Sequence, residues 1–518
     1  MEFVSIFNDV LGPVMRGPSS SHTAGSYHIG RLARSLLGET PASAVFTFDP
    51  GGSYGRTFRQ QGVDLGFAAG LLGWPITDPR FPEALRLAGA ESLAIDFRTE
   101  TLPWADHPNA VKIDLASRRG RALSLAAKST GGGGILITRL NDWPVAIDGK
   151  SHETFVLAEP AAGEAVRRTW KVVKETGAEV GVAEQSGRIL LHYRSLVAPR
   201  AAARAALESV AGVHEVRVVE PVFFVRRGEP LFRSAEDMVR FAAEAGLSLG
   251  RAALAYESRL LGMSEKEALA EMTRRLAIMK ESVRQGLEER DLRLQLLRPS
   301  ARKIFAAESR GLLALGGPTA RAAARAMAVM HAGNSMGVVV AAPTGGAAGT
   351  IPGALLTLVE EKNLSEESAA LALFAAGAVG LIVAARATFA AEVAGCQVEI
   401  GAAGAMAAAA VVEAAGGSAR QAADAAAISF QNTMGSVCDL VQGACEIPCH
   451  TRNAAAAAGA FTCADLILGG YENPIPLDET VDAVFAAGKM IPAELRVTSL
   501  GGLAVAPSAL ALPNLRKS

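Results

Sequence analysis

The spacing of hydrophobic and polar positions changes twice along the chain, which predicts three regions. Residues 1–150 contain short apolar or alternating runs, such as 44–48 and 135–138, separated by Gly- and Pro-rich turns. A helical stretch at 26–37 precedes them. Short strand-like runs mixed with a helix predict an α+β domain over 1–150.

The second region, 151–225, alternates strand-like and helix-like segments. The candidate strands are 155–158, 180–183, 188–193 and 213–219, and the candidate helices are 162–176 and 199–210. This βαββαβ order is that of the ferredoxin-like fold. We therefore expect a small ferredoxin-like domain between the two larger ones.

The third region, 229–518, shows helical spacing over 234–245, 265–288 and 319–331 and has few β-branched clusters. Small residues dominate 367–415, and small side chains let helices approach closely, so we expect a mostly α-helical C-terminal domain. Its longest uncharged apolar run, 369–385, has seventeen residues and consists largely of Ala and Gly. We interpret this run as a buried core helix and not as a membrane span.

Composition narrows the classes of function. The 518 residues carry a net charge of −1, which argues against nucleic acid or an anionic membrane as the main partner. No stretch combines a basic start, an apolar segment and a small-residue cleavage site, so we expect a cytoplasmic protein. All five cysteines lie between 396 and 463. This skew suggests a local use, although buried free cysteines are also common in Ala-rich cores.

Several polar or Gly-rich segments are candidates for ligand binding. Residues 17–25 read Gly-Pro-Ser-Ser-Ser-His-Thr-Ala-Gly directly before the predicted helix, so they can cap it and bind an anion. Breaks at 342–349 and 447–449 expose helix N-termini, where backbone N–H groups can hold a carboxylate. The glycines of 131–134 precede a strand instead of a helix. We therefore expect a close approach of the backbone there and not a nucleotide loop.

Three of the cysteines are candidate metal ligands. Cys396, Cys438 and Cys449 are separated by forty-one and ten residues, a spacing typical of neither zinc fingers nor ferredoxin-like cysteine runs. Three thiolates could hold an iron–sulfur cluster, which normally takes four, and the open iron would be a Lewis acid. Cys445 lies between the last two, so spacing alone leaves the ligand set open.

Taken in order, these motifs resemble the bacterial iron–sulfur-dependent L-serine dehydratases (L-serine ammonia-lyases) over nearly the full chain. The matching segments are 12–25, 107–109 (His-Pro-Asn) and 129–134 in the N-terminal part, and 342–353, 395–401, 447–449 with 452–453, and 501–504 in the C-terminal part. The middle region is similar to the ACT domain that some members carry. The resemblance implies a β part over 1–150, an ACT-like domain over 151–225 and a catalytic α part over 229–518, fused in one chain.

The resemblance also implies the site. It assigns Cys396, Cys438 and Cys449 as ligands of a [4Fe–4S] cluster with one iron lacking a protein ligand, without pyridoxal phosphate, and leaves Cys445 and Cys463 as non-ligands. It implies catalytic roles for Ser19, Ser20, Ser21, His22, His107 and Thr344. It implies substrate contacts for Thr23, Asn109, Gly345, Gly346, Gln397, Arg452 and Asn453.

The implied reaction is a β-elimination of L-serine. The open iron would bind the β-hydroxyl, a base would take the α-proton, and the aminoacrylate product would hydrolyse to pyruvate and ammonia. The partner would be a small amino acid, and the assembly a homodimer. One departure concerns the base: where the family commonly has Lys-Gly-His-Gly-Thr-Asp, residues 59–64 read Arg-Gln-Gln-Gly-Val-Asp. Gln61 therefore replaces a histidine and cannot accept a proton at neutral pH.

Three alternatives stay open at this point. The same elimination could act on threonine or cysteine. A pyridoxal-phosphate dehydratase could use Lys303 as its Schiff-base lysine, although no glycine-rich phosphate loop lies near it. A non-catalytic amino-acid sensor could combine an ACT-like module with a vestigial cluster domain.

Overall fold

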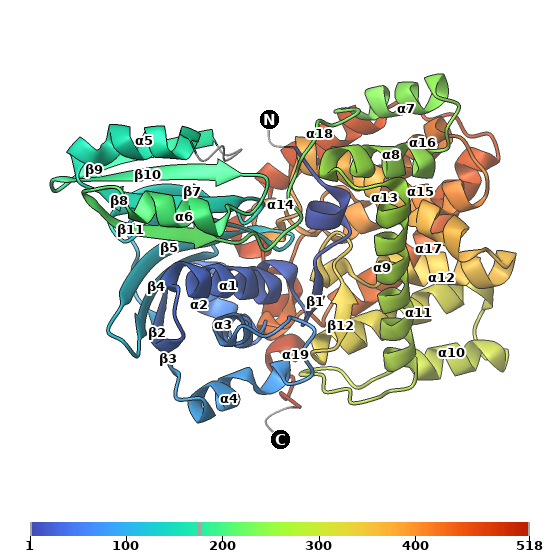
Figure 1. Ribbon diagram of the computed structural model, residues 1–518. Coiled ribbons are helices and arrows are strands. Elements are labelled where there is room, and N and C mark those ends of the chain that lie inside the picture. Colours follow the sequence, from blue (N-terminus) through green and yellow to red (C-terminus); the bar gives the residue numbers. More distant parts are fainter. Residues whose placement is uncertain (1–2, 173–177, 516–518) are drawn as a thin grey trace.

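The computed structural model describes residues 3–172 and 178–515 (Figure 1). Sheets gather on one side of the molecule, in the blue-to-green N-terminal part, and a helical bundle forms the other side. The chain is thus mixed α/β, with sheets in the N-terminal half and helices in the C-terminal half, which confirms the coarse expectation from sequence.

Among the described residues, the first domain contains a six-stranded sheet in the order β3-β2-β4-β5-β6-β7. Its strands are β2 (Pro41–Phe48), β3 (Ala94–Thr99), β4 (Ala110–Ser117), β5 (Ala122–Gly131), β6 (Gly134–Leu140) and β7 (Trp143–Ile147). Its helices are α1 (Gly25–Leu37), α2 (Ser53–Thr57), α3 (Val63–Leu72) and α4 (Ala84–Ala90). Stacked Phe46 and Phe67 join the sheet to α3, so an aromatic core fixes the helix layer over the strands.

The glycine run at 131–134 forms the turn of the β5–β6 hairpin and contacts the helical domain. Gly131 and Gly133 have φ angles of 100° and 95°, which favour glycine. A Cβ on Gly131 would lie 2.9 Å from the Ala390 Cβ, and one on Gly133 would lie 2.7 Å from Pro13. The expected close approach of the backbone is confirmed.

The middle region has the predicted βαββαβ order. Its elements are β8 (His152–Ala158), α5 (Gly163–Val172), β9 (Ala178–Gln185), β10 (Arg188–Ser195), α6 (Ala201–Glu208) and β11 (Val213–Val219). In residues 3–172 and 178–515, these strands form a separate antiparallel sheet in the order β11-β8-β10-β9. The end of the helix predicted over 162–176 lies outside the described residues.

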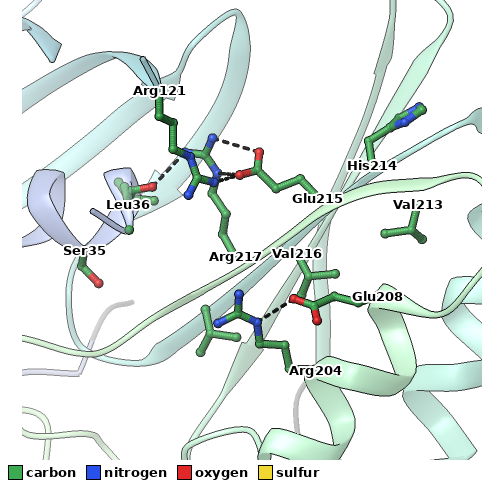
Figure 2. Close-up of a pocket in the computed structure, with 12 residues that line it drawn as sticks. Ser35, Leu36, Arg121, Arg204, Glu208, Val213, His214, Glu215, Val216 and Arg217 are labelled. Carbon is green, nitrogen blue, oxygen red and sulfur yellow. Dashed lines mark hydrogen bonds and ion pairs between the residues drawn. The ribbon is translucent and has the colours of Figure 1, made fainter. Parts of the chain in front are cut away.

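Charged side chains join the middle region to the first domain (Figure 2). Glu215 of β11 pairs with Arg121 of the first domain and with Arg217, the latter at 2.8 Å. Arg217 also donates a hydrogen bond to the Leu36 carbonyl at the end of α1, at 2.8 Å. One carboxylate between two guanidinium groups therefore ties the edge of the second sheet to the first domain.

The C-terminal part is a helical bundle, as predicted. Its helices are α7 (Ala235–Glu244), α8 (Leu249–Leu261), α9 (Glu265–Leu287), α10 (Ala301–Ser309), α11 (Gly317–Asn334), α12 (Thr350–Lys362), α13 (Glu366–Arg386), α14 (Ala391–Ala394), α15 (Ile400–Ala414), α16 (Ala419–Thr433), α17 (Cys449–Leu468), α18 (Leu477–Met490) and α19 (Pro507–Leu510). Within the described residues, two helical segments, Glu366–Arg386 and Cys396–Ala414, are long and apolar enough to cross a membrane. Most of each is buried inside the fold, which fits the interpretation of 369–385 as a core helix.

The first residues of the chain pack into this helical bundle and not onto the six-stranded sheet. Glu257 of α8 accepts hydrogen bonds from the Ser5 hydroxyl (2.6 Å) and from the backbone N–H groups of Ile6 (2.8 Å) and Phe7 (2.9 Å). Further along, β1 (Val14–Arg16) pairs antiparallel with β12 (Val338–Val340). The region predicted as 1–150 therefore shares its first segment with the C-terminal core, an association that local spacing cannot reveal.

Candidate active site

The serine-rich segment at 19–22 forms a buried turn directly before α1. The Ser19 hydroxyl accepts a hydrogen bond from the His22 backbone N–H at 3.2 Å and so caps this turn. The His22 ring lies among hydroxyls: Nδ1 is 3.1 Å from Ser19 Oγ and 3.0 Å from Ser21 Oγ, and Nε2 is 3.0 Å from Ser53 Oγ. The imidazole is therefore held in one orientation from both ring nitrogens.

A carboxylate from the helical domain completes this group. Glu392 of α14 accepts hydrogen bonds at Oε1 from Ser21 Oγ (2.7 Å) and Asn109 Nδ2 (3.2 Å), and this oxygen lies 3.7 Å from His22 Nδ1. Burial lowers the pKa of His22 to about 4, although Glu392 opposes the shift. Burial would raise the pKa of Glu392, but His22 and the Ser21 hydrogen bond outweigh it, so this pKa falls below its usual value. At neutral pH the pair is a carboxylate beside a neutral imidazole.

The His107-Pro-Asn109 turn supports this carboxylate. The His107 ring accepts a hydrogen bond at Nδ1 from the Asn109 backbone N–H, at 3.1 Å, which fixes the turn. Burial lowers the pKa of His107, while Glu392 raises it in part. The turn therefore orients Glu392 through Asn109.

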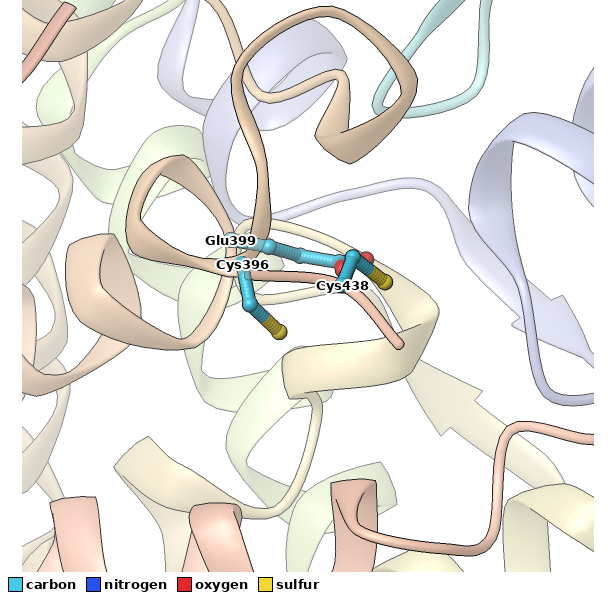
Figure 3. Close-up of side chains that lie close together, drawn as sticks. All are labelled: Cys396, Glu399 and Cys438. Carbon is cyan, nitrogen blue, oxygen red and sulfur yellow. The ribbon is translucent and has the colours of Figure 1, made fainter. Parts of the chain in front are cut away.

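The three candidate cysteine ligands come from separate segments and are all buried. Cys396 follows α14, and Cys449 is the first residue of α17. Cys438 lies in an extended segment, and its backbone N–H donates a hydrogen bond to the Leu495 carbonyl at 2.8 Å. Figure 3 shows Cys396 and Cys438 beside Glu399, and the ligand atoms of these three residues all lie within 4.8 Å of one another.

Two further thiols, those of Cys445 and Cys449, lie near this group. Cys438 lies close enough to Cys396 to shift the pKa of that thiol, and Cys449 lies close enough to Cys445 to shift the pKa of the Cys445 thiol. The neighbouring Cys396 thiol and burial raise the pKa of Cys438 most, and the charges of Glu399 and Cys449 raise it further. Cys445 and Cys449 therefore share the cavity with Cys438, while Glu399 and not Cys449 completes the group of ligand atoms within 4.8 Å of one another.

Gly395 allows Cys396 to reach this position. Its φ angle is +76°, and a Cβ there would lie 2.8 Å from the Ser436 carbonyl oxygen. Any other residue at 395 would push apart the two segments that carry Cys396 and Cys438.

The surroundings of the thiols fit an anionic iron–sulfur cluster. Arg452 donates to the Val437 carbonyl (2.7 Å) and to Asp439 (3.0 Å), and its guanidinium is close enough to Cys396, Cys438 and Cys449 for their charges to raise its pKa. The neighbouring thiol of Cys438, with a smaller contribution from Arg452 and against the effect of burial, lowers the pKa of Cys396 to about 7. Iron–sulfur clusters are held by cysteine thiolates, and a neighbouring cation favours the thiolate form, so this donor set fits such a cluster.

One cavity joins the two groups of residues. It is lined from the N-terminal domain by the 19–22 turn and Gln61, and from the helical domain by Thr344, Gly346, Glu392, Glu399, Cys438, Cys445 and Cys449. Cys396 lies outside this lining, beside Cys438. Thr344 donates a hydrogen bond to Glu399 at 2.6 Å, and burial raises the pKa of Glu399 to about 8.

Other residues implied by the resemblance lie behind the cavity wall. Asn453 donates from Nδ2 to the carbonyls of Gly346 (2.8 Å) and Cys449 (2.9 Å). Gln397 donates to the Ala394 carbonyl (2.9 Å) and accepts from the Gly435 N–H (2.8 Å). Both amides therefore fix backbone segments that carry cavity residues.

Thr23 and Gly345 have similar supporting positions. The Thr23 hydroxyl donates to the Gln61 carbonyl at 2.6 Å. A Cβ on Gly345 would lie 2.9 Å from the Ser20 backbone nitrogen. The structure thus places Gly345 against the serine turn and Thr23 against the segment that carries Gln61.

Sequence reasoning did not single out Glu392 or Glu399. The sequence did contain a signal for these two residues, because they are the only charged residues between Arg386 and Glu413. An acidic residue in such an apolar stretch is expected to be buried, and buried carboxylates are usually paired.

A cavity that combines a neutral histidine, a buried carboxylate and several cysteines, supplied by two domains, has the features of an enzyme active site, and the cysteines are consistent with an iron–sulfur cluster. The family model for the serine dehydratase alpha chain matches residues 244–504. The chain is 36% identical to the probable L-serine dehydratase alpha chain of Bacillus subtilis, over 54% of this chain and 93% of that protein.

Two further relatives agree. The L-serine dehydratase alpha chain of Peptoniphilus asaccharolyticus is 33% identical, over 53% of this chain and 94% of that protein. The probable L-serine dehydratase beta chain of Bacillus subtilis is 42% identical, over 29% of this chain and 66% of that protein. The chain belongs to the serine dehydratase family, and one polypeptide carries segments similar to both chain types.

Proposed function

We propose that the protein is an L-serine dehydratase that converts L-serine to pyruvate and ammonia by β-elimination. The observation that carries the proposal is the single cavity that joins the 19–22 turn to Cys438 and Cys449. The names of the relatives support serine over threonine or cysteine as the substrate. A sensor would not need a neutral histidine beside a cysteine cluster, so catalysis is favoured.

Cys396, Cys438 and Cys449 would hold a [4Fe–4S] cluster with one iron free of protein ligands. When bound, such a cluster supplies a Lewis acid that makes the serine hydroxyl a better leaving group. Arg452 would offset part of the negative charge of the thiolates and keep the 437–439 segment in place.

His22 is the proposed acceptor of the α-proton. Its low pKa leaves the imidazole neutral at neutral pH, so Nδ1 can take a proton while Nε2–H donates to Ser53. The Ser21 proton is already donated to Glu392, which keeps that hydroxyl from competing as a donor to Nδ1. The carboxylate 3.7 Å away would stabilise the imidazolium that forms.

Glu392 also gives the substrate a binding orientation. A buried carboxylate is the natural partner for the ammonium group of an amino acid. The substrate carboxylate would then lie toward the Ser19 and Ser20 hydroxyls. His107, Asn109, Thr344, Arg452 and Asn453 would act by positioning these groups, because their hydrogen bonds go to cavity residues or to the backbone.

The remaining proposals concern organisation. Residues 1–150, 151–225 and 229–518 would be the β-type, ACT-like and α-type parts. The βαββαβ element order supports a regulatory module in the middle. The substrate is a small molecule, and the enzyme would be a cytoplasmic homodimer that uses no pyridoxal phosphate.

Anaerobic reconstitution with iron and sulfide, followed by measurement of pyruvate and ammonia from L-serine, tests the proposal. Cys438→Ala is expected to lose both the brown chromophore and turnover. Cys463→Ala is the matched control, because Cys463 is buried in α17 but does not line the cavity. A reconstituted protein that carries the cluster and yields no pyruvate from L-serine would refute the assignment.

A further inference from the structure

Gln61 is a buried residue that lines the cavity and carries one donor atom, Nε2, without a partner among the described residues. The residue is 2% exposed and lines the cavity together with the 19–22 turn. Within residues 3–172 and 178–515, no atom accepts a hydrogen bond from Gln61 Nε2. Buried polar atoms are nearly always paired, so an unpaired one in a cavity points to a ligand atom as its partner.

The backbone around Gln61 is held from several directions. Its N–H donates to the Thr57 carbonyl at 3.0 Å, and its carbonyl accepts from the Thr23 hydroxyl at 2.6 Å. The preceding carbonyl, of Gln60, accepts from Gln295 Nε2 at 2.9 Å. The amide therefore sits on a fixed support in the absence of a ligand, which reduces the ordering cost of binding.

Two other donors on the cavity wall are already committed, whereas Ser19 and Ser20 also line the cavity and can share the ligand carboxylate with Gln61. The Ser21 hydroxyl donates to Glu392, and the Thr344 hydroxyl donates to Glu399. The same wall carries two carboxyl groups and three thiols, so a ligand carboxylate needs a donor that is still available. Gln61 Nε2 supplies one, and an amide nitrogen can donate but cannot accept a proton.

We propose that Gln61 Nε2 donates a hydrogen bond to the carboxylate of the bound amino acid and thereby selects α-carboxylate ligands. The choice of an amino acid as the ligand rests on the proposed function. Gln61 is then a binding residue and not a base, and the ammonium group of the ligand lies toward Glu392. Loss of the donor weakens recognition of the carboxylate without changing proton transfer.

The test compares L-alanine with L-alaninamide, which share a side chain without a leaving group and differ at the carboxylate. Binding to the anaerobic holoenzyme is measured by calorimetry at pH 7. Gln61→Met keeps the length of the side chain and removes the donor, and Gln61→Leu is the second variant if the first does not fold. Gln60→Met is the control, because Gln60 is the adjacent residue and does not line the cavity.

Gln61→Met is expected to weaken L-alanine binding about ten- to hundredfold, as for a lost hydrogen bond to a charged group, and to leave L-alaninamide within about threefold. The KM for L-serine should rise by the same factor while kcat changes little. Unchanged L-alanine affinity, or an equal loss for both ligands, would overturn the inference. If binding is selective for the carboxylate and depends on Gln61, but the enzyme forms no pyruvate from L-serine, the inference about Gln61 stands. Only the proposed function is then refuted.

Discussion

Replacing Glu392 by Gln tests the proposed proton transfer most directly. The substitution keeps the shape of the side chain and an oxygen that can accept from Ser21, but it removes the negative charge 3.7 Å from His22 Nδ1. In the proposed reaction His22 becomes cationic, so the carboxylate stabilises the protonated imidazole that forms as the α-proton leaves. The variant should therefore turn substrate over slowly, and its KM for L-serine should also rise, because Glu392 is the proposed partner of the substrate ammonium group.

The structure sets the size of the effect. Two unit charges 3.7 Å apart attract each other by about 4 kcal/mol at an effective dielectric constant of about 20. His22 and Glu392 are both buried, so solvent screens this attraction little. Because each 1.36 kcal/mol changes a rate tenfold, kcat should fall by about 10²- to 10³-fold.

The assay couples pyruvate formation to NADH oxidation by lactate dehydrogenase under anaerobic conditions. Iron and sulfide content must equal that of the wild type, so that a lost cluster is not mistaken for lost proton transfer. Glu413→Gln is the matched control: Glu413 accepts from Ser248 Oγ at 2.6 Å and does not line the cavity, so its kcat should be unchanged. A fully loaded Glu392→Gln enzyme with kcat within threefold of the wild type would refute His22 as the acceptor.

Three further predictions test the metal site and the fold. Cys449→Ala should abolish the visible absorbance of the reconstituted protein, whereas Cys463→Ala should preserve it; iron analysis of both variants decides. Burial lowers the pKa of His28 from 6.5 to about 4. Below pH 6.5 the unfolded state therefore binds a proton that the folded state does not bind. The free energy of unfolding consequently falls by up to about 3 kcal/mol toward pH 4. His28→Gln should make urea denaturation less sensitive to acid, and an unchanged slope would contradict the burial argument. Gly286→Ala places a Cβ 2.0 Å from the Ala328 carbonyl oxygen, so it should destabilise the α9–α11 packing by about 1–3 kcal/mol, seen as a lower Tm.

Local sequence pattern was enough to predict the elements that are themselves local. The run at 44–48 is part of β2, the stretch at 26–37 is part of α1, and the alternation over 151–225 gave the observed βαββαβ order. In each of these segments the hydrophobic residues recur with the spacing of one element type: every second residue in a strand, and every third or fourth residue in a helix. This spacing can be read from the segment alone.

Pairings between distant segments could not be predicted in this way. Strands β1 and β12 are three residues long and more than 300 residues apart, so neither carries a pattern that identifies its partner. The hydrogen bond from Ser21 to Glu392 spans 371 positions. Cysteine spacing left the ligand set open, and the family resemblance was needed to choose among the four thiols in and beside the cavity.

The cavity exists only when the N-terminal and helical parts are assembled. Ser21 needs Glu392 as its acceptor, and the first residues of the chain need Glu257 of the helical core. In Bacillus subtilis the similar sequences are named as separate alpha and beta chains. Joining them in one polypeptide makes their contact intramolecular, so the effective concentration of each part for the other no longer depends on dilution. We therefore expect the specific activity of this protein to stay constant on dilution over a concentration range in which two separate chains would dissociate. If the activity instead falls on dilution and returns when more of the same protein is added, a further association, such as dimer formation, also completes the site.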